Sequence, residues 1–151
     1  MSEVRVRVWR IEPHSPSQFL LVLVDDEQQI LPMSIGLCEA VSIQSVVRRN
    51  EAFPRFDNTH DLLGALITRL GGRLTKVVID DLWKKVYFAK LHISLNGETL
   101  AVDARPSDAV AIALRMGAPL YATDMVMAAA NEPEEPPEPG EGGPGLEPDD
   151  V

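Results

Sequence analysis

The chain of 151 residues has little cysteine and few aromatic residues: one Cys, two Trp, two Tyr and four Phe. A single cysteine excludes an intramolecular disulfide framework and fits a reducing compartment. No apolar run approaches the roughly 20 residues that span a bilayer, and the first four residues do not resemble a signal peptide. We therefore expect a cytoplasmic protein that does not associate with membranes.

Several sequence signatures of enzymes are also missing. The chain has no Walker loop, no glycine-rich dinucleotide fingerprint, no zinc-ligand spacing and no nucleophile elbow. These absences exclude the common nucleotide, zinc and serine-hydrolase classes. We expect no organic cofactor.

Lysine and arginine are absent from residues 131–151, which contain eight acidic residues, six prolines and four glycines. All 14 Lys and Arg lie before this segment, so residues 1–130 have a net charge of about −1, compared with −9 for the whole chain. Such a segment buries too little apolar surface to offset the entropy lost on ordering. We expect one domain, residues 1–130, and a disordered acidic tail, residues 131–151. The tail either solvates the protein or competes with nucleic acid for a basic surface.

Hydrophobic periodicity predicts an α+β fold of mainly antiparallel strands with packed helices. The patterns indicate strands at 4–11, 19–24, 30–35, 73–80, 86–95, 98–103 and near Leu120, and helices at 36–49, 59–70, 106–116 and 123–130. Shifting the first half by 69 positions aligns the two halves without a gap and places residues 39–43 on residues 108–112. We therefore expect two duplicated β-β-β-α halves.

The dipeptide Asn96-Gly97 predicts a two-residue hairpin turn. The resulting register pairs Lys90 with Asp103, either as a cross-strand salt bridge or as part of a polar pocket. One face of the hairpin is then expected to be core: Leu91, Ile93, Leu100 and Val102.

The predicted helix at residues 36–49 is apolar around most of its circumference. We expect burial on more than one side, and hence a homodimer. Cys38 on this helix is either a buried thiol or a nucleophile, and the first interpretation is the more common for such a residue.

Polar residues gather where a predicted strand meets a predicted helix, at Asp103–Ala109. Pro106 suits the first turn of a helix, and Asp108 suits the positive end of its dipole. The segment is either a self-contained Asp/Arg cap or part of a functional site. A second such place is Thr59-His60-Asp61, either an N-cap with its dipole partner or an imidazole and a carboxylate with a chemical role.

Three separated segments together resemble the bifunctional nuclease family. They are Leu31–Gly36 followed by Glu39–Ala40, Thr59–Leu63, and Asp103–Ala109 followed by Ala113–Arg115. The resemblance covers about residues 3–130 and implies a small α+β domain, a wedge-shaped homodimer with a groove for the active site, and cleavage of both DNA and RNA. The motif positions that carry over as catalytic candidates are Glu39, His60, Asp61, Asp103, Arg105 and Asp108. Met33-Ser34 departs from the family, which tends to have a bulkier residue there.

Phosphodiester cleavage needs stabilisation of charge on the phosphoryl oxygens and an activated nucleophile. The acidic candidates Glu39, Asp61, Asp103 and Asp108 are hard oxygen ligands suited to Mg²⁺ or Mn²⁺. Arg105 and Lys90 are candidate phosphate-binding residues, and His60 or His92 a candidate base. The near-neutral charge of residues 1–130 opposes tight nucleic-acid binding. The alternative is a non-catalytic oligomeric binding or regulatory module in which the Asp/Arg motif is structural.

Overall fold

A computed structural model describes residues 2–48 and 58–133 of the chain. These ranges contain seven strands and four helices. They are β1 (Glu3–Ser15), β2 (Gln18–Val24), β3 (Ile30–Gly36), α1 (Leu37–Val47), α2 (Thr59–Arg69), β4 (Arg73–Trp83), β5 (Val86–Leu95), β6 (Glu98–Ala104), α3 (Pro106–Met116), β7 (Leu120–Thr123) and α4 (Asp124–Ala130). The predicted tail lies outside the described residues, apart from residues 131–133.

The strands form one sheet in the order β3-β2-β1-β7-β4-β5-β6. Every neighbouring pair is antiparallel except β4 and β7, which are parallel. The predicted α+β class with mainly antiparallel strands is thus confirmed. The order β-β-β-α occurs twice along the chain, and the two strand triplets flank β7. An origin of the two halves by duplication stays a prediction.

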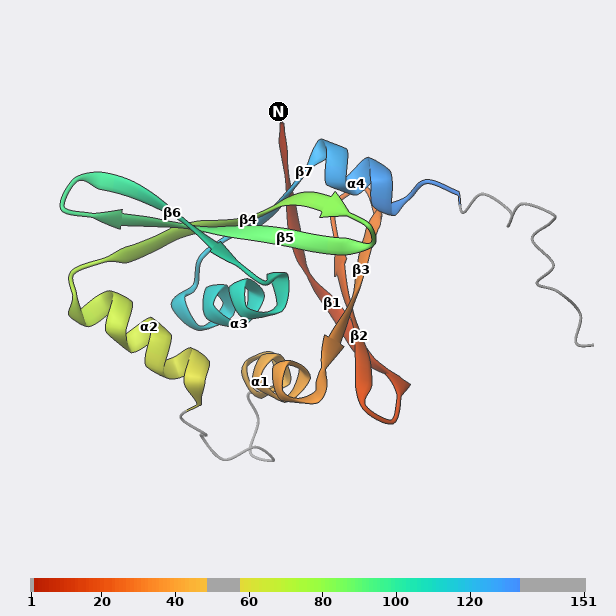
Figure 1. Ribbon diagram of the computed structural model, residues 1–151, viewed down its shortest axis with the longest axis horizontal. Coiled ribbons are helices and arrows are strands. Elements are labelled where there is room, and N and C mark those ends of the chain that lie inside the picture. Colours follow the sequence, from red (N-terminus) through yellow and green to blue (C-terminus); the bar gives the residue numbers. More distant parts are fainter. Residues whose placement is uncertain (1, 49–57, 134–151) are drawn as a thin grey trace, which may run out of the picture.

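Helix α3 is the centre of the helical layer. It packs against β4 and β5, and α1 and α2 pack against it from either side (Figure 1). Its residues 109–113 are buried because alanines and small aliphatic side chains allow the neighbouring elements to approach closely. Helix α4 covers the other face of the sheet, where it contacts β3, β4 and β7 (Figure 1).

The core lies between the sheet and these helices. Its fully buried large side chains come mainly from β2, β3, β4 and α1: Leu21, Leu23, Leu31, Ile43, Val77 and Ile79. Within residues 2–48 and 58–133, no helix has the length and hydropathy that crossing a membrane would require.

The predicted register of the β5–β6 hairpin is confirmed, since Lys90 pairs with Asp103 and Leu95 with Glu98. The predicted core face is only partly right. Leu91 is buried, but Leu100 and Val102 are 41% and 42% exposed. The physical reason is that β6 is an edge strand, and α3 packs on β4 and β5 instead.

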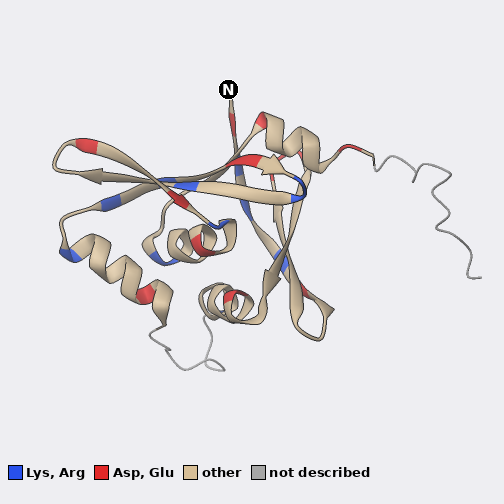
Figure 2. Ribbon diagram, in the orientation of Figure 1, with Lys and Arg blue, Asp and Glu red and all other residues tan. Residues whose placement is uncertain are grey.

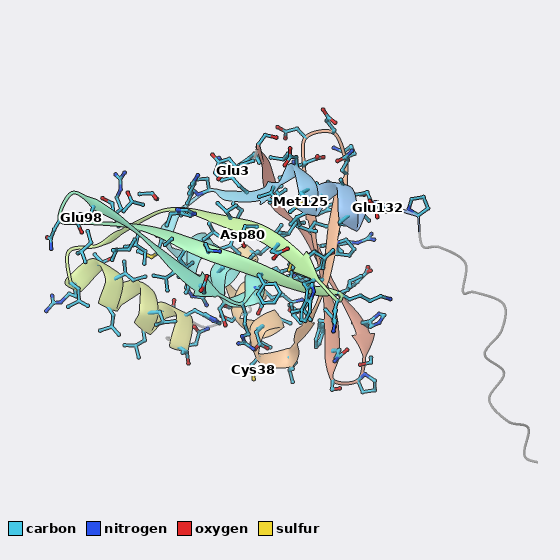
Figure 3. All side chains as sticks on the ribbon, turned by 45° about the horizontal axis from the view of Figure 1, so that its top comes forward. Glu3, Cys38, Asp80, Glu98, Met125 and Glu132 are labelled. Carbon is cyan, nitrogen blue, oxygen red and sulfur yellow. The ribbon has the colours of Figure 1, made fainter. Side chains whose placement is uncertain are left out.

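Within the chain α1 buries one side, through Ala40, Ser42 and Ile43, and leaves an apolar side exposed. Burial of a second side depends on the predicted dimer and stays a prediction. The prediction for Cys38 on this helix needs a correction. Cys38 is exposed rather than buried, and Figure 3 shows it on the outer side of α1. The first turn of α2 is also capped by Asn58 and not by Thr59.

Candidate functional site

The junction between β6 and α3 contains an ion pair between two of its own residues, Arg105 and Asp108. Arg105 precedes the helix in an extended conformation, Pro106 takes the first helical position, and Asp108 follows in the first turn. Arg105 Nε donates to Asp108 Oδ2 at 2.7 Å and Arg105 Nη2 donates to Asp108 Oδ1 at 3.0 Å. Such a two-point contact fixes the plane of the guanidinium group. The short sequence spacing therefore holds Arg105 in one orientation.

Glu39 on α1 joins this pair from the other half of the chain. Its Oε1 accepts a hydrogen bond from Arg105 Nη2 at 3.0 Å. The carboxylate lies folded back against Gly36, where an added Cβ would be 2.6 Å from Glu39 Oε2. The backbone of Gly36 has an ordinary φ of −79°, so a larger residue here would act by displacing the Glu39 carboxylate and not by straining the chain. Figure 2 shows one acidic segment on α1 and one on α3, the two helices that supply these carboxylates.

His60 on α2 lies beneath Asp108 and is 8% exposed. Its Nε2 is 2.8 Å from Asp108 Oδ1, and its Nδ1 is 2.6 Å from Ser42 Oγ. Ser42 Oγ also accepts from Asn58 Nδ2, at 3.2 Å. Both contacts of the ring are satisfied if Ser42 donates to Nδ1 and Nε2–H donates to Asp108. His60 thus holds the Asp108 carboxylate in place, and neither ring nitrogen is left for a substrate.

Asn58 and Asp61 fix the start of α2 and hence the position of His60. The Asn58 side chain accepts from the backbone N–H groups of His60 and Asp61, and the Asp61 side chain accepts from the Asn58 N–H. This reciprocal arrangement is a capping box. Asp61 therefore has a structural role at the helix start, in a capping box with Asn58.

Arg115 on α3 ties the three helices together from inside. Its Nε donates to Asp61 Oδ1 at 2.8 Å, its Nη1 to Ala111 O at 3.0 Å and its Nη2 to Ser42 O at 3.1 Å. The Arg115 side chain is only 6% exposed. A buried guanidinium needs this many partners because its desolvation costs several kcal/mol. The Arg115 contacts keep α1, α2 and α3 in register beneath the site.

Two carboxylates of this region have pKa values below the ordinary range. For Asp108, burial alone would raise the pKa, but the hydrogen bonds from Arg105 and His60 outweigh it and lower the value. For Asp61, burial likewise acts upward and is outweighed by the Asn58 N–H and by Arg115. Both groups are therefore held as carboxylates at neutral pH.

A second ion cluster lies on the other side of Arg105. Lys90 on β5 donates to Asp80 Oδ2 at 2.6 Å and is 3.5 Å from Asp103 Oδ1. Hydrogen bonding to Asp80, more than to Asp103, raises the pKa of Lys90. Asp80 sits at a β-bulge between Ile79 and Asp81, which displaces it from the regular alternation. The Asp103 side chain is 90% exposed.

Two grooves share Arg105, Val86 and Tyr87 in their lining. The main groove, of about 940 Å³, is lined by Pro32–Gly36, Glu39, Leu82, Lys85–Tyr87, Arg105–Ser107 and Ala129–Ala130. The hairpin groove, of about 700 Å³, is lined by Asp80–Asp81, Val86–Lys90, Asp103–Arg105 and Met125. Figure 3 shows two of these residues, Asp80 on β4 and Met125 on α4, over the same region of the sheet. Arg105 lines both grooves, so a ligand in either one would meet its guanidinium group.

The structure brings together four of the predicted site residues, Glu39, His60, Arg105 and Asp108. Lys90 and Asp103 form the second cluster, and Asp61 lies behind the first. His92 lines neither groove. Ser42 and Asp80 were not predicted as contributors, and Arg115 was predicted only as the end of a motif, with no role. Ser42 could have been found as a polar residue on an otherwise apolar helix. Asp80 depends on a bulge that no sequence pattern indicated.

The carboxylates do not form a ready metal site. Among residues 2–48 and 58–133, no group of three or more His, Cys, Asp or Glu side chains is placed to hold a metal ion. Glu39 and Asp108 are bonded to Arg105, and Asp61 is bonded to Arg115. A divalent ion would have to displace a guanidinium group from its carboxylates, so the predicted ligand set does not fit one as arranged.

Comparison with known proteins places these residues in a family context. Residues 21–135 match the model of the bifunctional nuclease domain. An uncharacterized protein of Mycobacterium tuberculosis is 39% identical over 130 residues, which is 86% of this chain and 76% of that protein. Bifunctional nuclease 1 of Oryza sativa subsp. indica and a bifunctional nuclease of Oryza minuta are each 27% identical over 118 residues. The match covers 76% of this chain and only 35% of each rice protein.

Proposed function

Because the chain belongs to the bifunctional nuclease domain family, we propose that it is a nuclease that hydrolyses phosphodiester bonds in DNA and RNA. The names of the rice relatives support the activity, and the geometry around Arg105 supports the place where it occurs. The catalytic unit is the domain of residues 1–130, in a cytoplasmic protein. Substrate lies in the main groove with its phosphate against Arg105.

The observation that carries the proposal is that Arg105 is both held by hydrogen bonds and exposed to solvent. Its hydrogen bonds within the described residues use Nε and Nη2, and its side chain is 66% exposed although three such bonds hold it. An arginine held through Nε and Nη2 has its Nη1 donors available for a phosphate oxygen. Because the group is already oriented, little entropy is lost when it meets the developing charge of the transition state.

The other members of the cluster have different roles in this proposal. Glu39 lines the main groove and is the carboxylate placed to orient or deprotonate an attacking water. The lowered pKa of Asp108 makes it a poor proton acceptor, so it anchors Arg105. His60 is a positioning residue for Asp108, since both of its ring nitrogens are engaged within the protein.

The charge of the cluster limits how it binds a phosphodiester. Glu39 and Asp108 together outweigh the single positive charge of Arg105, so the cluster alone repels an anion. Additional positive charge has to come from nearby lysines or from a divalent ion. Mg²⁺ or Mn²⁺ dependence therefore stays a prediction, and no organic cofactor is proposed. Activity measured with EDTA, and after adding back each metal, decides the point.

The test of the activity is cleavage of plasmid DNA and of a labelled RNA by highly purified protein. Asp108→Asn, Asp103→Asn and Glu39→Gln are each expected to lower turnover by about 10²-fold, the usual loss on removing one charge-stabilising group. Arg105→Lys is also expected to be damaging, because an ammonium group cannot replace the two-point contact. Full activity of Glu39→Gln and Arg105→Lys, or an inactive wild type with every metal, would contradict the proposal.

We also propose that the active form is a homodimer. Its contact surface is the leucine face, the exposed apolar side chains of α1 and α2: Leu37, Val41, Val47, Leu62, Leu66 and Leu70. Contiguous exposed apolar patches commonly mark protein interfaces, and a stable dimer buries about 1,200–2,000 Å² in total. Light scattering is expected to give twice the chain mass for the wild type and the chain mass for Leu66→Lys. A wild type that stays monomeric at micromolar concentration contradicts the dimer.

One observation favours the second candidate function, a non-catalytic oligomeric binding or regulatory module. The Arg105–Asp108 contact joins residues three apart and also closes the turn before α3, so a purely structural role accounts for it. Such a module would show no turnover with any metal. Its Asp108→Asn variant would lose stability or dimerisation, with no activity to lose.

A further inference from the structure

The turn between β4 and β5 has an unusual composition. Lys84 and Lys85 form this two-residue turn with φ values of 48° and 64°. Residues other than glycine or asparagine are disfavoured there, because the left-handed conformation costs roughly 1–2 kcal/mol per residue. The two-residue turn between β5 and β6 uses the favoured pair, Asn96 and Gly97. The chain thus has two lysines in a turn whose backbone geometry disfavours them.

Next to this turn lies a row of exposed apolar side chains, two of them aromatic. Trp83 pairs directly with Val86, and Phe88 follows two residues later on the same face of the hairpin. Trp83, Val86 and Phe88 are 61%, 54% and 44% exposed. We call this row the hairpin face. It leads to Lys90 and Arg105 across the hairpin groove, which Val86 and Phe88 also line.

We propose that the hairpin face is a stacking platform for unpaired bases of a single-stranded nucleic acid, with Lys84 and Lys85 contacting the flanking phosphates. This inference rests on the proposed function, because it names the form of substrate that reaches Arg105. Exposed aromatic rings bind single strands by stacking on free base faces, which a duplex does not offer along its length. The platform therefore binds unpaired segments and positions them beside the main groove.

The composition of this surface favours nucleic acid over a protein partner. Lysine is depleted in protein interfaces, whereas here two lysines border the rings, and Lys84 Nζ lies 4.5 Å from the centroid of the Trp83 ring. The leucine face, which lacks aromatic side chains, is a separate surface that is suited to a second copy of the chain.

The charge of the hairpin predicts how the affinity depends on salt. Asp80 and Asp103 are paired with Lys90, and Asp81 lies opposite Phe88, so the surface carries as many carboxylates as lysines. Stacking must then supply most of the affinity. We expect the binding constant to fall only weakly with salt, unlike that of proteins that neutralise many phosphates.

Intrinsic fluorescence tests the stacking directly, since the chain has two tryptophans, Trp9 and Trp83. The Trp9→Phe variant keeps only Trp83, and oligothymidylate is expected to quench it. The Trp83→Phe variant keeps only Trp9, which lines neither groove, and is expected to be unaffected. Quenching of neither tryptophan, or equal quenching of both, overturns the platform.

Binding is measured by fluorescence anisotropy with labelled oligothymidylate and with a blunt duplex, and a gel verifies that both remain intact. Trp83→Ala and Phe88→Ala are each expected to weaken single-strand binding by about 5-fold or more, the effect of removing one stacked base, and to leave duplex binding unchanged. Trp9→Ala is the matched control, because Trp9 is 53% exposed and also carries a cation over its ring. Unchanged single-strand binding by Trp83→Ala and Phe88→Ala overturns the proposal.

A double substitution, Lys84→Asn with Lys85→Gly, separates stability from binding. It introduces the favoured turn pair, so the melting temperature is expected to rise while single-strand affinity falls. An unchanged affinity for the single strand would show that Lys84 and Lys85 do not contribute to binding. Loss of the dimer mass in Trp83→Ala overturns the proposal and assigns the hairpin face to a protein contact.

The outcomes also separate the platform from the nuclease activity. If oligothymidylate quenches Trp83 but the wild type cleaves neither DNA nor RNA, the platform stands and the nuclease proposal fails. If the wild type cleaves both, and Trp83→Ala and Phe88→Ala cleave single strands at the same rate as the wild type, the activity stands and the platform is wrong.

Discussion

Arg115 is the residue whose loss should most disturb the helical layer beneath the site. The change to methionine keeps the length and the helix propensity of the side chain and removes its charge and donors. It would leave Asp61 without its cation and would remove the bond from α3 to the carbonyl of Ser42, which would keep the donor from Ser45 Oγ within α1. The perturbation therefore acts on three helices at one point.

The magnitude follows from the burial of the two partners. Breaking a buried ion pair by removing one side costs about 3–5 kcal/mol. Asp61 is 33% exposed and can recover some hydration, so we place Arg115→Met at the lower end, about 3 kcal/mol. For a domain of this size that lowers the melting temperature by roughly 10 °C.

The assay is urea unfolding followed by circular dichroism, with Arg69→Met as the matched control. Arg69 is exposed in the last turn of the neighbouring helix, so the same substitution there should change the free energy of unfolding by less than about 0.5 kcal/mol. A double-mutant cycle with Asp61→Asn is expected to show coupling between the two residues. If Arg115→Met is as stable as Arg69→Met, the role assigned to Arg115 is wrong.

Three further predictions concern the same structure. Gly36→Ala should push the Glu39 carboxylate away from Arg105 and lower turnover about as much as Glu39→Gln does, with a melting temperature close to that of the wild type. The lowered pKa values of Asp61 and Asp108 stabilise the fold above the ordinary value of 3.8 and lose that contribution as the pH falls below it, so Asp61→Asn should flatten the stability profile in acid. Removing residues 134–151 should leave the melting temperature nearly unchanged, and a drop of many degrees would show that this segment docks on the domain.

The secondary structure could be predicted from the sequence because it depends on local patterns. Alternation of apolar residues indicated the strands, and Asn96-Gly97 set the register of β5 and β6 correctly. Local patterns do not say which side of an edge strand is covered. For that reason Leu100 and Val102 were assigned to the core although both are exposed.

The site could be predicted only in part, for the same physical reason. The matching acidic residues Glu39 and Asp108 were found by aligning the two halves, and the structure brings both to Arg105. The contact between His60 and Ser42 depends on how α2 packs against α1, which no spacing reveals. The Lys84–Lys85 turn was missed because a pair of lysines is not a turn signal.

Glu39 is the residue that best separates a structural role of the cluster from a catalytic one. Asp108 closes the turn before α3 and also bonds to His60, so any change there alters stability and chemistry together. Glu39 reaches Arg105 from another helix, through a single hydrogen bond, and that contact is not needed to close the turn. A Glu39→Gln protein that folds and dimerises normally but cleaves nucleic acid far more slowly therefore cannot be explained by a cap.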